Sequence, residues 1–69
     1  MTSDPSDLQG REVIVEIQKI GAAQRVAAID VATGVEVIIQ APATAAYADV
    51  RSLVMKKLAL ALKTQSRER

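Results

Sequence analysis

The sequence predicts an α+β fold, in which a C-terminal helix covers one face of an antiparallel three-stranded β-meander. Three runs rich in β-branched residues are separated by short loops that each contain a glycine, which is typical of consecutive hairpins. After Pro42 the apolar spacing changes from the period of a strand to that of a helix. We expect strands at about residues 12–20, 23–30 and 35–41, and the helix at about residues 45–63.

One small domain accounts for the 69-residue chain. Hydrophobic residues make up 49% of it and charged residues 25%, a balance typical of a folded domain rather than of a disordered chain. The two ends of the sequence are largely polar, and the first ten residues include Pro5 and Gly10. We therefore place the domain at residues 11–63, between a mobile N-terminal tail, 1–10, and a frayed C-terminal tail, 64–69.

The first hairpin is predicted by alternation and by a tight turn. In residues 12–20, Val13, Val15 and Ile17 share one face of a strand. Gly21-Ala22 follows as a two-residue loop, with glycine at the first central position of a type II′ turn, where φ is positive. The second strand begins directly after this turn.

The second hairpin has a longer loop, Val31-Ala32-Thr33-Gly34. Asp30 can close this loop by accepting hydrogen bonds from backbone N–H groups, and Gly34 can take a positive φ. Asp30 is therefore interpreted as a turn cap rather than as a catalytic acid. The third strand ends at Pro42, which has no N–H group for strand pairing.

The two loops set the register of the strands. They place Ile17 opposite Val26, and they place Ala28 opposite Val37. A register one residue off at the second loop would exchange the two faces of the third strand, and this alternative stays open. In the favoured register one face is an apolar wall for the helix, made of Val13, Val15, Ile17, Val26, Ala28, Val35, Val37 and Ile39.

The helix has a wider apolar arc than the sheet needs. Thr44 is the expected N-cap. At about 100° per residue the apolar side chains form a continuous stripe, extended by Leu60 on one side and by Met55 and Leu62 on the other. We expect these flanks to be exposed, because a three-stranded sheet covers only part of the arc. The stripe itself consists of Tyr47, Val50, Leu53, Val54, Leu58 and Ala61.

The composition excludes the usual catalytic and metal-binding groups. The chain has no cysteine and no histidine, so it has no disulfide, no zinc site of the Cys/His kind and no Cys or His nucleophile or base. Glu16 and Glu36 share the outer sheet face, but the second strand lies between them, so no carboxylate pair brackets a pocket. We predict that the protein is not an enzyme and that it uses no cofactor and no metal.

No targeting segment is apparent. Residues 1–9 carry Asp4 and Asp7 and have no apolar core, unlike a signal peptide. The longest apolar stretch, residues 53–62, is interrupted by Lys56 and Lys57 and is too short to cross a bilayer. We therefore expect a cytoplasmic protein with no membrane span.

Charge is distributed unevenly along the chain. Residues 1–49 hold seven acidic and three basic side chains, whereas residues 50–69 hold six basic and one acidic. Lys56, Lys63 and Arg67 fall in a narrow sector of the helix, where they could contact phosphates or an anionic surface. Basic residues near a helix C-terminus also complement its dipole, and the net charge is only +1. The composition therefore disfavours nucleic acid as a partner.

Three parts of the sequence carry a family pattern. They are Glu12-Val13-Ile14-Val15-Glu16, then the run from Ala28 to Val37, then Pro42 with Lys57-Leu58. The most specific piece, Ala-Ile-Asp-x-x-Thr-Gly-x-Glu-Val, is a hairpin signature rather than a catalytic one. Together these parts resemble a family of short alphaproteobacterial proteins of unknown function. The resemblance covers residues 12 to about 60, and it implies a fold but no site.

Two surfaces have more apolar area than one copy of the fold uses, namely the centre of the outer sheet face and the flanks of the helix. Contiguous exposed apolar patches usually mark an interface. The edge of the first strand is also open, with Val13-Ile14-Val15 and no inward charge or proline to blunt it. The candidate interface residues are Ile14, Ala27, Ile29, Ile38, Leu60 and Leu62.

These observations predict a small interaction module that self-associates as a homodimer or binds an unidentified protein partner. The outer sheet face is the first candidate for the interface, and the edge of the first strand is the second. The alternative is weak binding of nucleic acid or an anionic surface through the basic helix. The two hypotheses differ in their response to salt, because electrostatic binding weakens steeply as salt is added.

Overall fold

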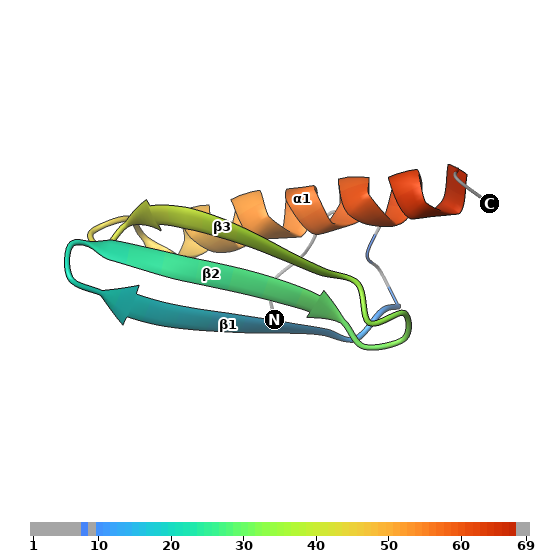
Figure 1. The fold of residues 1–69 in the computed structure, drawn as a ribbon, viewed down its shortest axis with the longest axis horizontal. Coiled ribbons are helices and arrows are strands. Elements are labelled where there is room, and N and C mark those ends of the chain that lie inside the picture. Colours follow the sequence, from blue (N-terminus) through green and yellow to red (C-terminus); the bar gives the residue numbers. More distant parts are fainter. Residues whose placement is uncertain (1–7, 9, 68–69) are drawn as a thin grey trace.

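The computed structural model describes Leu8 and residues 10–67. Strands β1 (Val13–Ile20), β2 (Ala23–Asp30) and β3 (Glu36–Pro42) form one antiparallel sheet in the order β1-β2-β3. The helix α1 (Tyr47–Arg67) follows and packs over β2 and β3 (Figure 1). The predicted α+β fold, a three-stranded meander with one C-terminal helix, is confirmed.

The sheet register agrees with the prediction at both hairpins. Ile17 pairs with Val26, and Ala28 pairs with Val37. Gly21 has a φ of 59° whereas Ala22 does not have a positive φ, which fits a type II′ turn. In the second hairpin, the N–H of Asp30 donates to the carbonyl of Val35 over 2.9 Å. The loop therefore closes where expected, and the alternative register is wrong.

The core lies between the helix and the inner face of the sheet. The central strand contributes Val26 and Ala28, which are fully buried, and β3 contributes Val37. These side chains belong to the predicted apolar wall, and its remaining members are half-buried or, for Ile17, exposed. The helix supplies the other side of the core with Val50, Val54, Met55 and Leu58.

Leu8, which the sequence analysis placed in the N-terminal tail, belongs to this core. Its side chain is buried in the apolar cluster, and its carbonyl accepts a hydrogen bond from the N–H of Arg11 over 3.1 Å. This bond closes a turn that leads into β1. The rest of the expected tail, apart from exposed Gly10, lies outside the described residues.

The helix begins later and ends later than predicted. The carbonyl of Ala46 accepts the first intrahelical hydrogen bond, from Val50 over 3.1 Å, so the N-cap is Ala46 and not Thr44. The buried side-chain amide of Gln24 explains the delay, because it donates to the carbonyls of Pro42 and Ala45 and holds this segment in a turn. At the other end, residues 64–67 are helical rather than frayed.

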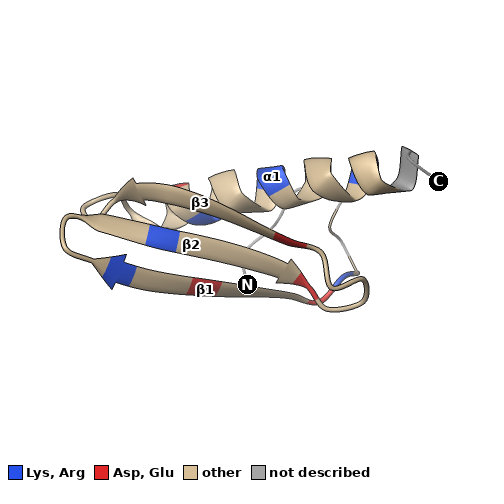
Figure 2. Ribbon diagram, in the orientation of Figure 1, with Lys and Arg blue, Asp and Glu red and all other residues tan. Residues whose placement is uncertain are grey.

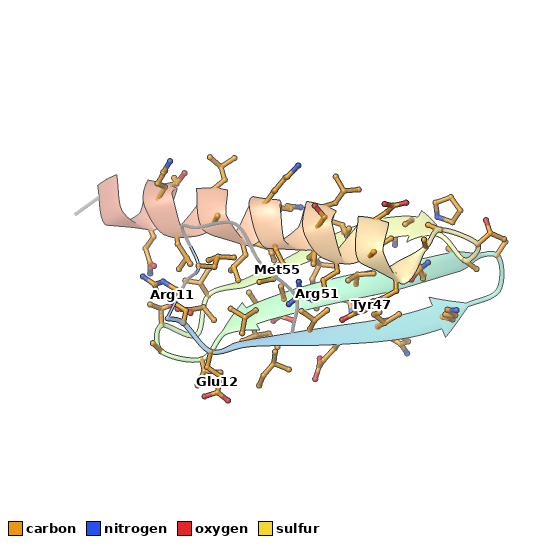
Figure 3. The ribbon with its side chains drawn as sticks, turned by 180° about the vertical axis from the view of Figure 1, so that it is seen from behind. Arg11, Glu12, Tyr47, Arg51 and Met55 are labelled. Atoms are coloured by element: carbon orange, nitrogen blue, oxygen red, sulfur yellow. The ribbon has the colours of Figure 1, made fainter. Side chains whose placement is uncertain are left out.

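The buried side of the helix is rotated relative to the predicted stripe. Met55, expected on an exposed flank, is only 1% exposed, and Figure 3 shows it between the helix and the sheet. Tyr47 and Leu53, expected to be buried, are 55% and 57% exposed. The reason is that α1 lies over β2 and β3. The side with Met55 therefore faces the sheet, while the side with Leu53 stays exposed. Lys57, one turn after Leu53, reaches the carbonyl of Ile38 on β3.

Candidate interaction surface

The apolar patch predicted on the outer sheet face does come together. Ile14 pairs with Ile29 across β1 and β2, and Ala27 pairs with Ile38 across β2 and β3. Only Ile14 is exposed, at 45%, whereas Ile29 and Ile38 are half-buried and Ala27 is buried. Neighbouring side chains on the same face therefore already cover the centre of this patch.

β1 is the least buried element of the sheet. None of its eight residues is buried, although five of them are valine or isoleucine. Ile17 is 38% exposed on the inner face and Ile20 is 60% exposed at the end of the strand. Because α1 packs mainly over β2 and β3, the inner face of β1 is only partly covered. Val13 and Val15 are half-buried against the core, whereas Ile17 is exposed.

The backbone of β1 also presents groups that pair with no other strand in the described part of the chain. The N–H of Val31 donates to the carbonyl of Glu12 over 3.0 Å, which fixes the alternation along the strand. Even-numbered residues of β1 hydrogen-bond to β2, so the N–H and C=O groups of odd-numbered residues point away from it. The outward groups belong to Val13, Val15, Ile17 and Lys19, and none of them pairs with another described strand.

The opposite edge of the sheet, at β3, is protected. The ammonium group of Lys57 on α1 donates to the carbonyl of Ile38 over 2.9 Å. Pro42 ends the strand and has no N–H group to offer. A lysine and a proline at an edge strand both oppose further strand pairing. The two edges of this sheet are therefore not equivalent.

The helix flanks differ from the prediction as well. Leu60 is 64% exposed, as expected for a candidate interface residue. Leu62 packs against the core cluster instead, because it lies on the same side of the helix as Met55. The exposed large apolar side chains of the helix are therefore Tyr47, Leu53 and Leu60. The sequence analysis missed the exposure of Leu53 because the helical spacing placed this residue inside the apolar stripe.

Two of the three candidate anion-binding residues lie on the solvent side of the helix. Lys56 and Lys63 are exposed, and the side chain of Arg67 lies outside the described part of the chain. Lys57, adjacent to Lys56, is engaged with the β3 edge. Figure 2 shows that basic positions occur on the helix and on the sheet, rather than in a single continuous patch.

Asp30 closes the second hairpin loop, as predicted. Its buried carboxylate oxygen Oδ2 accepts hydrogen bonds from the backbone N–H of Thr33 over 3.2 Å and from the Thr33 hydroxyl over 2.7 Å. The same oxygen also forms an ion pair with Arg11 over 3.0 Å. Sequence reasoning missed this long-range partner, because no local pattern connects Arg11 with Asp30. The pair ties the start of β1 to the end of β2.

The chain matches a described protein family over most of its length. Residues 10–65 match the family DUF6898, a domain of unknown function. The chain belongs to the DUF6898 family. The predicted resemblance to a family of unknown function is thereby confirmed. Comparison with the curated proteins and with the solved structures found no match.

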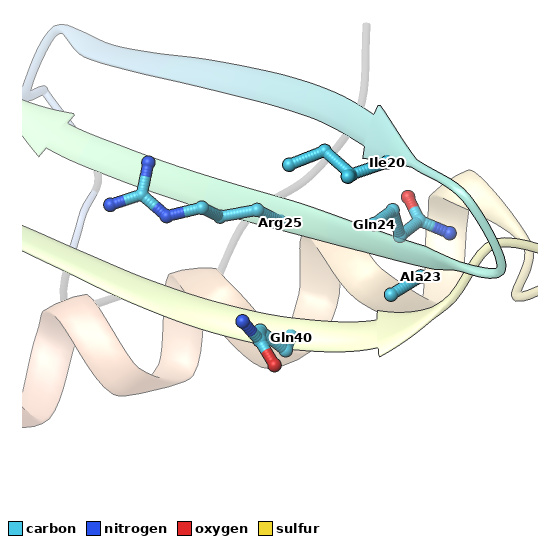
Figure 4. Close-up of a pocket in the computed structure, with 5 residues that line it drawn as sticks. All are labelled: Ile20, Ala23, Gln24, Arg25 and Gln40. Carbon is cyan, nitrogen blue, oxygen red and sulfur yellow. The ribbon is translucent and has the colours of Figure 1, made fainter.

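A hollow in the described part of the DUF6898 fold has no side chain typical of a catalytic site. A shallow hollow of about 160 Å³ lies at the turn end of the sheet, lined by Ile20, Ala23, Gln24, Arg25 and Gln40 (Figure 4). None of these side chains is a carboxylate or a nucleophile. Among all the described residues, no three acidic side chains gather into a group that could hold a metal ion.

The acidic side chains of the outer face are also kept apart in this DUF6898 chain. Glu16 pairs with Ala27, and Glu36 pairs with Ile29, so β2 separates the two carboxylates. No helix in the described part is long and apolar enough to span a bilayer. The described part of the chain therefore leaves the exposed β1 strand, whose outer edge pairs with no other described strand, as the candidate interaction surface.

Proposed function

We propose that this DUF6898 chain is a non-enzymatic interaction module that self-associates through β1. A single observation carries the proposal: the most apolar strand of the sheet has no buried residue, and the backbone groups at its outer edge pair with no other described strand. Exposed apolar strands with free edges readily pair with another chain, and proteins usually blunt them. Here Lys57 covers the β3 edge and Pro42 ends it. On β1 the inner-face charge is Lys19, which lies near the end of the strand and leaves the edge at Val13, Val15 and Ile17 without such a charge.

The small size of the chain supports the same proposal. A domain of 69 residues buries a modest fraction of its surface, so association adds burial that the single copy lacks. The isoleucines Ile14, Ile17 and Ile20 are all exposed on β1. Clustered exposure of this kind is typical of an interface.

We change the order of the candidate surfaces. We place the β1 edge first and the outer sheet face second, because Ala27 is buried and Ile29 and Ile38 are half-buried without any partner. The outer face therefore has less apolar area left to bury on association. Ile14 belongs to both surfaces, since it lies on the outer face of the edge strand.

Sedimentation at increasing concentration tests the proposal. We expect the mass to rise from that of a 7.4 kDa monomer to twice this value between low micromolar and millimolar concentration, with little dependence on salt. Ile29→Asp serves as the matched control on the outer face and should leave this rise unchanged. A mass that stays monomeric over the whole range would contradict self-association.

A second candidate is binding of an anionic surface through the helix. Lys56 and Lys63 are exposed on its solvent side, and Leu53 and Leu60 are exposed beside them. Titration with mixed RNA and DNA, and separately with vesicles of anionic lipid, at low and at moderate salt, separates this function from the first. Binding that is lost on adding salt would support it, and no binding at low salt would exclude it.

A further inference from the structure

We infer that the partner of β1 is a second copy of the same chain, and that the two β1 strands pair antiparallel about a two-fold axis at Ile17. This inference rests on the proposed self-association and specifies its geometry. Pairing at this edge would join two three-stranded sheets into one continuous sheet. A two-fold axis makes the interface self-complementary, so one sequence has to provide both sides.

Backbone alternation restricts the registers that such a pair can adopt. Only Val13, Val15, Ile17 and Lys19 present outward N–H and C=O groups. In an antiparallel ladder these groups have to face the same kind of group on the partner strand. The odd-numbered residues of one copy therefore face odd-numbered residues of the other. Among such registers, we consider those that overlap along most of the strand, centred on Val15, Glu16 or Ile17.

Side-chain pairing disfavours two of these three registers. Centring on Glu16 places this carboxylate directly opposite its own copy, and like charges directly opposite destabilise a strand pair. Centring on Val15 places Glu16 opposite Ile14 of the second copy, so that a carboxylate faces an exposed apolar side chain. The same register leaves Ile20 opposite Gly10, so that the most exposed isoleucine of β1 gains no apolar partner.

The register centred on Ile17 gives each exposed isoleucine of β1 an apolar partner. Ile17 then faces its own copy on the inner face, and Ile14 faces Ile20 twice on the outer face. In the single copy, Ile17 is 38% exposed, Ile14 is 45% exposed and Ile20 is 60% exposed.

The remaining pairs are also compatible. Glu16 faces Gln18, an acceptor opposite an amide donor. Lys19 faces Val15 and can lay its aliphatic stem over it.

Cysteine scanning tests the register directly, because the chain has no cysteine of its own. In the Ile17 register the two Cα atoms of an Ile17→Cys dimer lie about 5.5 Å apart, within the range that a disulfide spans. The corresponding atoms of Val15→Cys or Lys19→Cys lie more than about 13 Å apart, since they are displaced by four residues along the strands.

Under mild oxidation we therefore expect Ile17→Cys to cross-link at least ten-fold faster than either neighbour. Fastest cross-linking of Val15→Cys, or of Ile29→Cys on the outer face, would overturn the proposed geometry while leaving self-association intact. A wild-type chain that stays monomeric would overturn the proposed function as well.

Introducing a positive or a negative charge at Gln18 gives an independent test of the register. Across the interface Gln18 faces Glu16, whereas within one copy it pairs with Arg25. Gln18→Lys should tighten dimerisation several-fold and Gln18→Glu should weaken it, while the stability of the dilute monomer should change in the opposite direction for each. Dimerisation that is equal in both variants would overturn the register.

Discussion

β1 and β2 are neighbouring strands of eight residues each, but the strand with more large apolar side chains is the less buried of the two. β1, VIVEIQKI, has five valine or isoleucine residues and none of its residues is buried. β2, AQRVAAID, has three alanines and several polar residues, yet it contains Gln24, Val26, Ala27, Ala28 and Asp30 as buried residues. Within a single copy, burial therefore follows position in the sheet rather than hydrophobicity.

The reason lies in the neighbours of each strand. β2 has a strand on both sides and α1 above it, whereas β1 has one neighbouring strand and little helix cover. Small residues such as Ala28 suit the crowded position, and buried polar residues such as Gln24 persist there because they are hydrogen-bonded. The apolar side chains of β1 have no comparable environment in the single copy.

Substitution of Asp30 should give the largest effect on the β2 side of this comparison. Asp30→Ala removes the buried oxygen that accepts one hydrogen bond from Arg11 and two from Thr33, so we expect the free energy of unfolding to fall by about 3 kcal/mol. Chemical denaturation measures this change. Asp30→Asn keeps one carbonyl oxygen and should lose less. A loss below that of the exposed control Glu36→Ala would contradict the structural role of Asp30.

A matched pair of truncations tests the comparison itself. Val26 and Ile17 are cross-strand partners, but Val26 is fully buried and Ile17 is 38% exposed. Val26→Ala should cost about 2 kcal/mol, whereas Ile17→Ala should cost less than about 1 kcal/mol in dilute solution. Denaturant titration at low micromolar concentration gives both values. Equal losses would mean that β1 is as well buried as β2.

The fold could be predicted because its signals are local. Gly21 and Gly34 take positive φ values in the two hairpin loops, and these loops fix the register and hence which side chains face the helix. The alternation of apolar residues predicted the strands themselves. The predicted turn-cap role of Asp30 follows from the same kind of short-range pattern, and its contacts to Thr33 confirm it.

The missed features all depend on contacts between distant parts of the chain. The rotation of α1 is not encoded in its wide apolar arc, because several orientations bury similar side chains. The pairing of Arg11 with Asp30 spans 19 residues, and so does the bond from Lys57 to the carbonyl of Ile38. The predicted N-cap, Thr44, was wrong for the same reason, because the distant Gln24 side chain holds the segment before the helix in a turn.

Truncation of Gln24 tests how the buried polar end of β2 organises the helix start. Gln24→Ala removes the two hydrogen bonds to the carbonyls of Pro42 and Ala45, and we expect a loss of about 1–2 kcal/mol. The exposed Gln40→Ala is the control and should change stability by less than about 0.5 kcal/mol. Hydrogen exchange at the first turn of α1 should accelerate only in Gln24→Ala.

The smallest expected change in stability concerns the protected edge. Lys57→Met keeps an aliphatic side chain but releases the carbonyl of Ile38, so the free energy of unfolding should change by less than about 0.5 kcal/mol. The β3 edge then loses one of its two protecting features, and we expect light scattering to show more association than in wild type at high concentration. The exposed control Lys56→Met should scatter like wild type.

Strands that are neighbours in the sheet are also consecutive along the chain, and both connecting loops are short. Contacts between residues close in sequence form quickly, because little loop-closure entropy is lost before they are made. The meander can therefore assemble before the helix docks. Joining of two copies at β1 is instead a bimolecular step, so its rate should rise with protein concentration while the rate of folding within one copy stays constant.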